Sequence, residues 1–303
     1  MKVAAIDLGT NTFLLLVAEV MGGRIDRVLH DEARVIRLGQ GVNQTKRLHP
    51  EALARAKECF AEFAHTIQKL GVDKVRAVAT SAARDVENGS ELIALGADFG
   101  IPIDIIPGEM EAELTFWGTF REDPKGPAVI VDTGGGSTEY ILGGPDGIEE
   151  RISLDIGSVR MTEMFVTRHP IPSAEMTKMT NFIRDQVSVL RGKFSVSGKN
   201  LVAVAGTPTT LAAIDQGRAF ESDLVDGHVL TLERLGEFVD TMVKMSVEER
   251  QKLAGMEPKR ADVIVAGALI LKSSCEALGA TGLEVSVRGL RYGLARKLGG
   301  LAT

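Results

Sequence analysis

The stretch V-I-V-D-T-G-G-G-S-T-E-Y-I-L, residues Val129–Leu142, reads as a buried strand, a glycine turn opened by an acid, and a second strand. The β-branched run that opens it is typical of a buried strand, and it places Asp132 at the strand's end. Consecutive glycines allow backbone N–H groups to approach phosphate oxygens, and hydroxyls add further donors. The residues that would contact the phosphate are Gly134, Gly135, Gly136 and Ser137. A tight hairpin would also explain two of the glycines, so this stretch alone leaves both interpretations open.

The same pattern occurs at the N-terminus, in V-A-A-I-D-L-G-T-N-T-F-L-L-L-V, residues Val3–Val17. Asn is the non-glycine residue that best tolerates a left-handed backbone, so an Asn in place of a turn glycine keeps the geometry. This internal duplication predicts two similar lobes. If their turns face one another, two acids and two amide-lined loops share a cleft that suits a phosphate with a divalent cation. The alignment has no gap and pairs Asp7 with Asp132, Gly9 with Gly134, Asn11 with Gly136 and Thr12 with Ser137.

Length and composition are those of a globular protein with two domains. The chain has 303 residues, 44% of them hydrophobic and 25% charged, and a net charge of −6. A negative net charge argues against a general polyanion-binding surface, so nucleic acid is not an expected partner. The polar, proline-containing segment 121–127 predicts a boundary between an N-terminal lobe, 1–124, and a C-terminal lobe, 125–303. A terminal helix from about residue 288 can pack back on the first lobe.

The sequence favours a cytoplasmic location. Cys59 and Cys275 are the only cysteines, too few for a disulfide framework and not spaced as metal ligands. Asp7 interrupts the first apolar run, so no signal peptide is expected. The run Val263–Leu271 has nine residues, well short of the ~20 that span a bilayer, and no membrane association is predicted.

Two further motifs follow predicted strands. Arg84, after the strand Lys74–Thr80, could bind a phosphate through its two-pronged guanidinium, or could lie on a solvated helix start. Thr207, after the strand Leu201–Val204, suits an N-cap, with Pro208 at the first helical position and free amides presented to an anion. An ordinary strand-to-helix turn explains the same letters. Arg260, near the start of the predicted helix 258–278, completes the candidate phosphate-binding residues.

The predicted helix after Pro107-Gly108 carries three acids in its first turns. Such acids commonly interact with the helix dipole, which is the alternative to a catalytic role. At 100° per residue, Glu109 and Glu113 share a face while Glu111 points about 200° away from Glu109. Glu111 can therefore face a ligand alone.

Six motifs, in order over nearly the whole chain, resemble those of the exopolyphosphatase/guanosine pentaphosphate phosphatase (Ppx/GppA) family, in its short form. Each motif is modest by itself, but the six in sequence are specific. They are D-L-G-T-N-T from Asp7, A-T-S-A-A-R to Arg84, G-E-M-E-A from Gly108, D-T-G-G-G-S-T-E from Asp132 to Glu139, G-T-P-T-T from Gly206 and S-V-R-G-L-R-Y-G from Ser286.

The resemblance implies an α/β fold of the actin-like ATPase and sugar-kinase superfamily, with two ribonuclease-H-like lobes and a cleft between them. It also implies hydrolysis of a terminal phosphoanhydride with Mg²⁺. Glu111 takes the place of the catalytic glutamate that activates water. Asp132 and Glu139 fall where acids hold the metal, and Asp7 is their first-lobe counterpart. Phosphate binding falls to Asn11, Thr12, Arg84, the Gly134–Ser137 loop and Thr207.

Inorganic polyphosphate is the leading substrate, and the guanosine alarmone pppGpp is the nearest alternative. A non-catalytic alarmone sensor and a kinase or ATPase of the same superfamily are the other classes; a sensor would not need Glu111. Leu14 stands where relatives are often basic, which weakens the case for the alarmone, and Met110 stands where an acid often precedes the glutamate. The sequence leaves ion preference and a homodimer open.

Overall fold

The computed structural model describes residues 1–120, 126–194, 196 and 200–301. The chain divides into two compact units, one formed by Met1–Glu122 with Arg288–Thr303 and the other by Asp123–Val287. Most of the predicted boundary segment, residues 121–125, lies outside the described residues.

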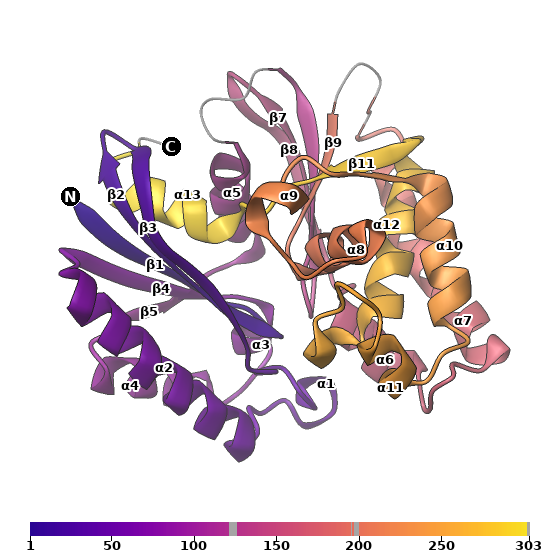
Figure 1. The fold of residues 1–303 in the computed structure, drawn as a ribbon, viewed down its shortest axis with the longest axis horizontal. Coiled ribbons are helices and arrows are strands. Elements are labelled where there is room, and N and C mark those ends of the chain that lie inside the picture. The colour runs from indigo at the N-terminus through magenta and orange to yellow at the C-terminus, as the bar shows by residue number, and fades with distance from the viewer. Residues whose placement is uncertain (121–125, 195, 197–199, 302–303) are drawn as a thin grey trace. The chain divides into compact units, whose positions relative to one another are not determined.

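The first unit is built on a mixed five-stranded sheet with the order β3-β2-β1-β4-β5 (Figure 1). β2 pairs antiparallel with β1 and β3, whereas β4 pairs parallel with β1 and β5. Because β1 and β4 are parallel and in register to their last residues, the segments that follow them leave from the same sheet edge. The strands are β1 Lys2–Leu8, β2 Thr12–Met21, β3 Arg24–Val35, β4 Lys74–Ala79 and β5 Ile103–Ile105.

The second unit has a mixed six-stranded sheet with the order β10-β11-β9-β6-β7-β8. Its β6, β7, β8 and β9 repeat the arrangement of β1, β2, β3 and β4, with two antiparallel pairs and one parallel pair. The duplication predicted from the two aspartate-led stretches is therefore present in the strand topology. The strands are β6 Ala128–Thr133, β7 Thr138–Gly144, β8 Gly147–Leu154, β9 Asn200–Val204, β10 Val229–Thr231 and β11 Gly282–Val285.

Helices complete each unit. The first unit contains α1 Val42–Thr45, α2 Pro50–Leu70, α3 Ser81–Arg84, α4 Gly89–Asp98, α5 Gly108–Thr119 and α13 Leu290–Leu298. The second contains α6 Ser158–Phe165, α7 Ser173–Val187, α8 Gly206–Gln216, α9 Ser222–Val225, α10 Leu232–Met242, α11 Val247–Gln251 and α12 Ile264–Leu278, and the short 3₁₀ helices η1 Ser188–Leu190 and η2 Pro258–Arg260.

Local signals define α2 at both ends. The His49 side chain accepts a hydrogen bond from the Glu51 N–H, and Pro50 occupies the first helical position, where its missing donor costs nothing. The helix ends at Gly71, whose φ of 62° is left-handed. A glycine after the periodic apolar residues of 50–70 predicts a helix stop at Gly71, and the structure confirms it.

Close helix contact ties the C-terminal helix α13 to α5. A Cβ on Gly293 would lie 1.8 Å from the Leu114 carbonyl oxygen, and one on Gly118 would lie 1.9 Å from the Gly289 oxygen. The two backbones can approach this closely only because both positions lack a side chain. The sheet and these two helices enclose one core cluster, while α2 and α4 cover another.

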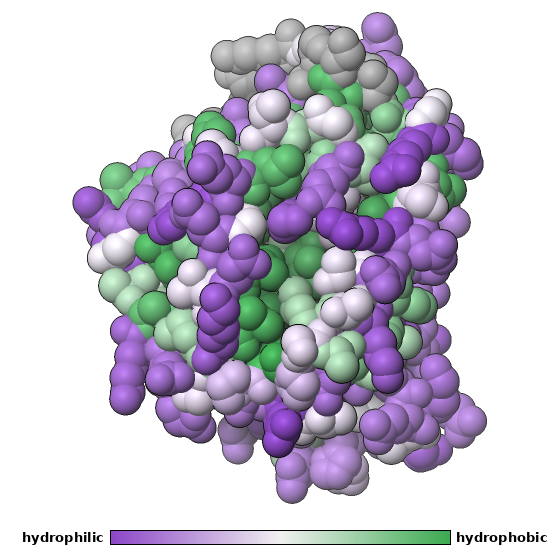
Figure 2. Space-filling view, turned by 90° about the vertical axis from the view of Figure 1, so that its right-hand side faces the viewer, coloured by the Kyte–Doolittle hydropathy of each residue, from purple (hydrophilic) through white to green (hydrophobic). Residues whose placement is uncertain are grey.

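The second unit packs around α12. This helix is buried on nearly all sides, where α6, α7, α8 and α10 contact it, and most of its residues are apolar. Within the part of the chain that the structure describes, no helix is long and apolar enough to cross a membrane. Figure 2 shows hydrophilic residues over most of the face in view, with hydrophobic residues reaching the surface near its centre.

Two sequence expectations differ from the structure. The sequence of residues 230–242 predicts a helix, but the helix begins only at Leu232, because Val229–Thr231 pairs with β11 as β10. The helix predicted over 258–278 is interrupted: η2 ends at Arg260, and α12 starts at Ile264.

Candidate functional site

The turn after β1 holds several buried donors in the first unit. The Gly9 N–H donates to the Thr12 carbonyl at 3.1 Å, which closes the turn. The Asn11 carbonyl accepts from the N–H groups of Ile36 and Arg37, each at 2.9 Å, so the N–H of the next residue points the opposite way. Asn11 is 5% exposed, and among the described residues its Nδ2 amide has no hydrogen-bond partner.

The turn after β6 repeats this geometry in the second unit. The Gly134 N–H donates to the Ser137 carbonyl at 3.0 Å, matching the Gly9 bond to Thr12. A Cβ on Gly157 would lie 2.4 Å from the Gly135 carbonyl carbon, so the start of α6 packs directly on the turn.

The carbonyl oxygens of this second turn all face α6. The Ser158 N–H donates to Gly134 at 3.0 Å, the Val159 N–H donates to Gly135 at 2.9 Å, and the Arg160 Nε donates to Gly136 at 2.7 Å. In a trans peptide the N–H lies opposite the C=O, so the next N–H groups point away from α6. Within the described part of the chain, those of Gly135, Gly136 and Ser137 have no acceptor, although all three residues are buried. Buried donors without acceptors are costly, and such a row is a ready anion site.

Asp132 and Glu139 lie directly opposite one another on β6 and β7. In antiparallel strands, side chains at opposite positions have Cβ atoms about 4.5–5.5 Å apart, and like charges there repel. Glu139 is 1% exposed, and its Oε1 accepts a 2.8 Å hydrogen bond from the Ser153 hydroxyl. Two adjacent carboxylates fit a divalent cation, which removes this repulsion.

No group of three or more His, Cys, Asp or Glu side chains that could hold a metal occurs among the residues the structure describes. One or two carboxylates with water are typical ligands of Mg²⁺, which rarely has an all-protein cage. Asp7, at the end of β1, lies opposite the apolar Leu14 rather than a second acid. The first-unit turn therefore carries one acid where the second carries two.

Glu111 and Arg84 contact each other in the first unit. Arg84 Nη1 donates to Glu111 Oε2 at 2.7 Å and to the Ile106 carbonyl at 2.9 Å. Glu111 is 7% exposed, whereas Glu109 is exposed and Glu113 is only partly buried. Glu111 is thus the acid of this helix that lies apart from the surface, and Arg84 holds its carboxylate in place. From the sequence we predicted that Arg84 binds phosphate; its pairing with Glu111 was not predicted.

The start of α8 combines a strained backbone with a cation. Ala205 has a φ of 81°, in the region that favours glycine. The Arg260 guanidinium lies against the next residue, since a Cβ on Gly206 would be 2.1 Å from Arg260 Cζ. Burial lowers the pKa of the Arg260 guanidinium to about 10, against the opposing charge of Glu257. A desolvated cation at a helix start interacts strongly with an anion.

The N-cap predicted at Thr207 is wrong. The helix begins one residue earlier, at Gly206, so Ala205 is the N-cap and Thr207 the second helical residue. Thr207 is 2% exposed, and its side chain faces Gly267 of α12, where a Cβ would lie 2.6 Å from the threonine hydroxyl. The left-handed Ala205 lets the helix start early, and Pro208 becomes the third residue instead of the first.

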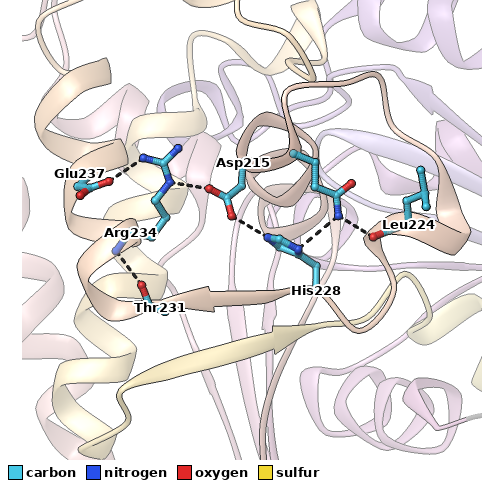
Figure 3. Close-up of polar contacts among 7 residues, drawn as sticks. Asp215, Leu224, His228, Thr231, Arg234 and Glu237 are labelled. Carbon is cyan, nitrogen blue, oxygen red and sulfur yellow. Dashed lines mark hydrogen bonds and ion pairs between the residues drawn. The ribbon is translucent and has the colours of Figure 1, made fainter.

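A polar network that sequence reasoning missed holds the other end of α8 (Figure 3). Asp215 accepts from Arg234 Nε at 2.5 Å and contacts His228 Nε2 at 2.8 Å. Burial raises the pKa of Asp215, but the hydrogen bonds from Arg234 and His228 outweigh it and hold this pKa below its ordinary value. No periodicity links these residues, because three different segments of the fold bring them together.

Known proteins share this architecture over the whole chain. Exopolyphosphatase 2 of Mycobacterium tuberculosis is 37% identical over 99% of both chains. An exopolyphosphatase from Cytophaga hutchinsonii superposes with a TM-score of 0.88 at 27% identity, over 100% of this chain and 99% of that one. The Ppx/GppA family member of Aquifex aeolicus superposes with a TM-score of 0.80 at 30% identity, over 98% of this chain and 97% of that one.

The model of the Ppx/GppA phosphatase family matches residues 16–298, which confirms the resemblance found in the six motifs. The family match, the repeated strand topology and the two aspartate-led turns point to the same family. The chain belongs to the Ppx/GppA phosphatase family.

Proposed function

We propose that the protein is an exopolyphosphatase that releases orthophosphate from the end of inorganic polyphosphate. The proposal is supported by family membership and by the 37% identity to an exopolyphosphatase over the full length of both chains. The roles proposed for individual residues rest on the geometry of each unit.

The observation that carries the proposal is the row of buried N–H donors at Gly135, Gly136 and Ser137. Three such groups without acceptors suit the oxygens of a terminal phosphate, which accept several hydrogen bonds at once. The Asn11 amide, also buried and without a partner among the described residues, adds a donor of the same kind in the first unit. Thr12 and Arg84 remain predicted phosphate ligands. The Thr207 side chain faces α12, which leaves its backbone N–H as the group for an anion.

Asp132 and Glu139 are the residues that would hold Mg²⁺, with Asp7 as the predicted first-unit counterpart. Bound there, the cation would neutralise charge on the phosphate oxygens. Arg260, which lies against the start of α8, would contribute a fixed positive charge that also neutralises phosphate oxygens.

Glu111 would act as the general base. The oxygen of a water molecule forms a bond to the terminal phosphorus, its proton passes to the Glu111 carboxylate, and the bridging P–O bond breaks, leaving the shortened chain. The 2.7 Å contact from Arg84 orients this carboxylate. In this scheme Arg84 positions Glu111 through Nη1, in addition to its predicted contact with phosphate.

The test is orthophosphate release from polyphosphate, pppGpp and ATP, compared side by side with Mg²⁺ and with a chelator. We expect metal-dependent release that is fastest from polyphosphate. Faster release from pppGpp would mean that the alarmone is the preferred substrate. Binding of pppGpp without orthophosphate release from any substrate would mean that the protein is a sensor.

A further inference from the structure

Arg160, in the first turn of α6, contacts the second-unit turn with both its backbone and its side chain. Its N–H donates to the Gly135 carbonyl at 3.0 Å, and its Nε donates to the Gly136 carbonyl at 2.7 Å. The Arg160 side chain is only 14% exposed, so it lies mostly within the protein. This arginine is therefore bonded to two successive peptide units of the turn.

We call the N–H groups of Gly135, Gly136 and Ser137 the donor row. Each of them belongs to a peptide unit whose carbonyl, that of the preceding residue, faces α6. The Gly134 and Gly135 carbonyls accept from backbone N–H groups at the start of α6. Among the described residues no backbone N–H donates to the Gly136 carbonyl, which accepts from the Arg160 side chain instead. Within the donor row, the Ser137 N–H is thus the one whose orientation depends on a side chain.

The first-unit turn shows what the arginine replaces. Asn11 is the counterpart of Gly136 in the repeat. Its carbonyl accepts from the backbone N–H groups of Ile36 and Arg37, each at 2.9 Å. The carbonyl is therefore held by backbone in the first unit and by the Arg160 guanidinium in the second.

The hydrogen bond from Arg160 affects how well the Ser137 N–H can bind an anion. A charged donor on the carbonyl makes a strong hydrogen bond and polarises the peptide, which strengthens the N–H of the same unit as a donor. Gly136 has no side chain, so without this bond the peptide could rotate at little cost. Rotation would turn a carbonyl oxygen, in place of an N–H, toward the phosphate oxygens and repel them.

We propose that Arg160 is a positioning residue that orients the Gly136–Ser137 peptide toward the terminal phosphate of the substrate. The inference rests on the proposed function, because it requires the donor row to bind a phosphate, and it adds a residue that acts through the peptide. The ion pair of Arg160 with Asp155 is not the basis of this role. Its atoms are 3.9 Å apart and the Asp155 side chain is 86% exposed, so the pair contributes little.

Arg160→Met and Arg160→Gln separate the hydrogen bond from the charge. The Gln amide nitrogen lies the same number of bonds from Cα as the Arg Nε, so Gln keeps a neutral donor, whereas Met has a similar length and no donor. The affinity for orthophosphate is measured by calorimetric titration with Mg²⁺; orthophosphate is the product, so no turnover occurs. We expect Met to raise the Kd about tenfold and Gln to raise it less than about threefold.

Amide NMR spectra of ¹⁵N-labelled protein distinguish positioning from general support of the fold. In the unmodified protein, orthophosphate should shift the N–H resonances of Gly135, Gly136 and Ser137. In Arg160→Met at saturating orthophosphate, the shift of the Ser137 resonance should be lost while those of the two glycines remain. A merely structural role would lower the melting temperature and change all three resonances alike.

Arg168→Met is the matched control, because it removes the same charge from an exposed position just after α6. It should leave the Kd and all three shifts unchanged. The role of Arg160 would be overturned by an unchanged Kd in Arg160→Met, by a loss in Arg160→Gln as large as in Arg160→Met, or by a Ser137 resonance that still responds to orthophosphate in Arg160→Met. Failure of the proposed function shows separately, as absence of orthophosphate release from polyphosphate by the unmodified protein with Mg²⁺.

Discussion

Glu139 lies directly opposite Asp132 across the β6–β7 hairpin, and the same register in the first unit sets Leu14 opposite Asp7. The two hairpins share strand pairing and the turn hydrogen bond but differ in the charge beside the aspartate. A carboxylate pair favours a divalent cation, whereas one carboxylate beside a leucine binds it weakly. The duplication has therefore kept its backbone and changed its chemistry, and the second unit is the one that carries the carboxylate pair of the proposed Mg²⁺ site.

Replacing Asp132 with Asn should raise the Mg²⁺ concentration needed for half-maximal activity by at least about tenfold, because one of two carboxylates in a hard-cation site is lost. Orthophosphate release is measured against Mg²⁺ concentration. Asp146→Asn, an exposed change at the turn before β8, is the control. Unchanged Mg²⁺ dependence in the Asp132 variant would remove this residue from the metal site.

Glu111→Gln should lower kcat about 10²–10⁴-fold while substrate affinity is retained, since the amide keeps the shape but cannot accept a proton. Glu109→Gln makes the same change on the same helix at an exposed position, and it should leave kcat unaffected. If Glu111 only supported the helix start, its variant would melt at a lower temperature and keep its activity. Steady-state kinetics and thermal melting together separate the two roles.

Gly293→Ala should destabilise the first unit, because the new methyl group would lie 1.8 Å from the Leu114 carbonyl oxygen. Backbone displacement of this kind reduces the free energy of unfolding by about 1–3 kcal/mol. Since α5 carries Glu111, kcat should fall as well. Gly236→Ala in α10 is the control: the nearest atom to its Cβ is Lys272 Cε at 3.7 Å, so the change should be neutral or slightly stabilising. Urea unfolding that is equally affected in both variants would contradict the role of the close α5–α13 contact.

Asp215→Asn should make stability less dependent on pH in acid. Hydrogen bonds from Arg234 and His228 outweigh burial and hold the pKa of Asp215 below its ordinary value, so the carboxylate stabilises the folded state above about pH 4. This contribution is lost as the pH falls through the lower pKa of the folded state. The unmodified protein should therefore lose stability more steeply below about pH 4 than the variant, which starts lower at pH 7. Urea midpoints measured from pH 7 down through and below about pH 4 check the slope, and parallel curves would mean that the network contributes no such stability.

Much of the fold follows from local sequence. The ends of α2 are encoded by a proline at its first residue and a glycine after its last, both acting through their own backbone preferences. The Asp7 and Asp132 turns are visible as a repeat because each motif is continuous in the chain. Glu111 is separable from Glu109 by helical angle alone, and its burial in the structure agrees with that separation.

Contacts between segments that are far apart in the sequence depended on the tertiary structure. Thr207 misses the N-cap because Ala205 adopts a backbone that its residue type disfavours, which no propensity reveals. Ser153 reaches Glu139 only through strand pairing that a bulge after Leu142 shifts out of simple register. The Arg84–Glu111 contact joins residues 27 positions apart, at the end of α3 and near the start of α5. Local sequence determines where the strands, turns and acids are, because backbone preferences act over a few residues; which charges meet is decided by packing, because contact energies depend on distances that only the folded chain sets.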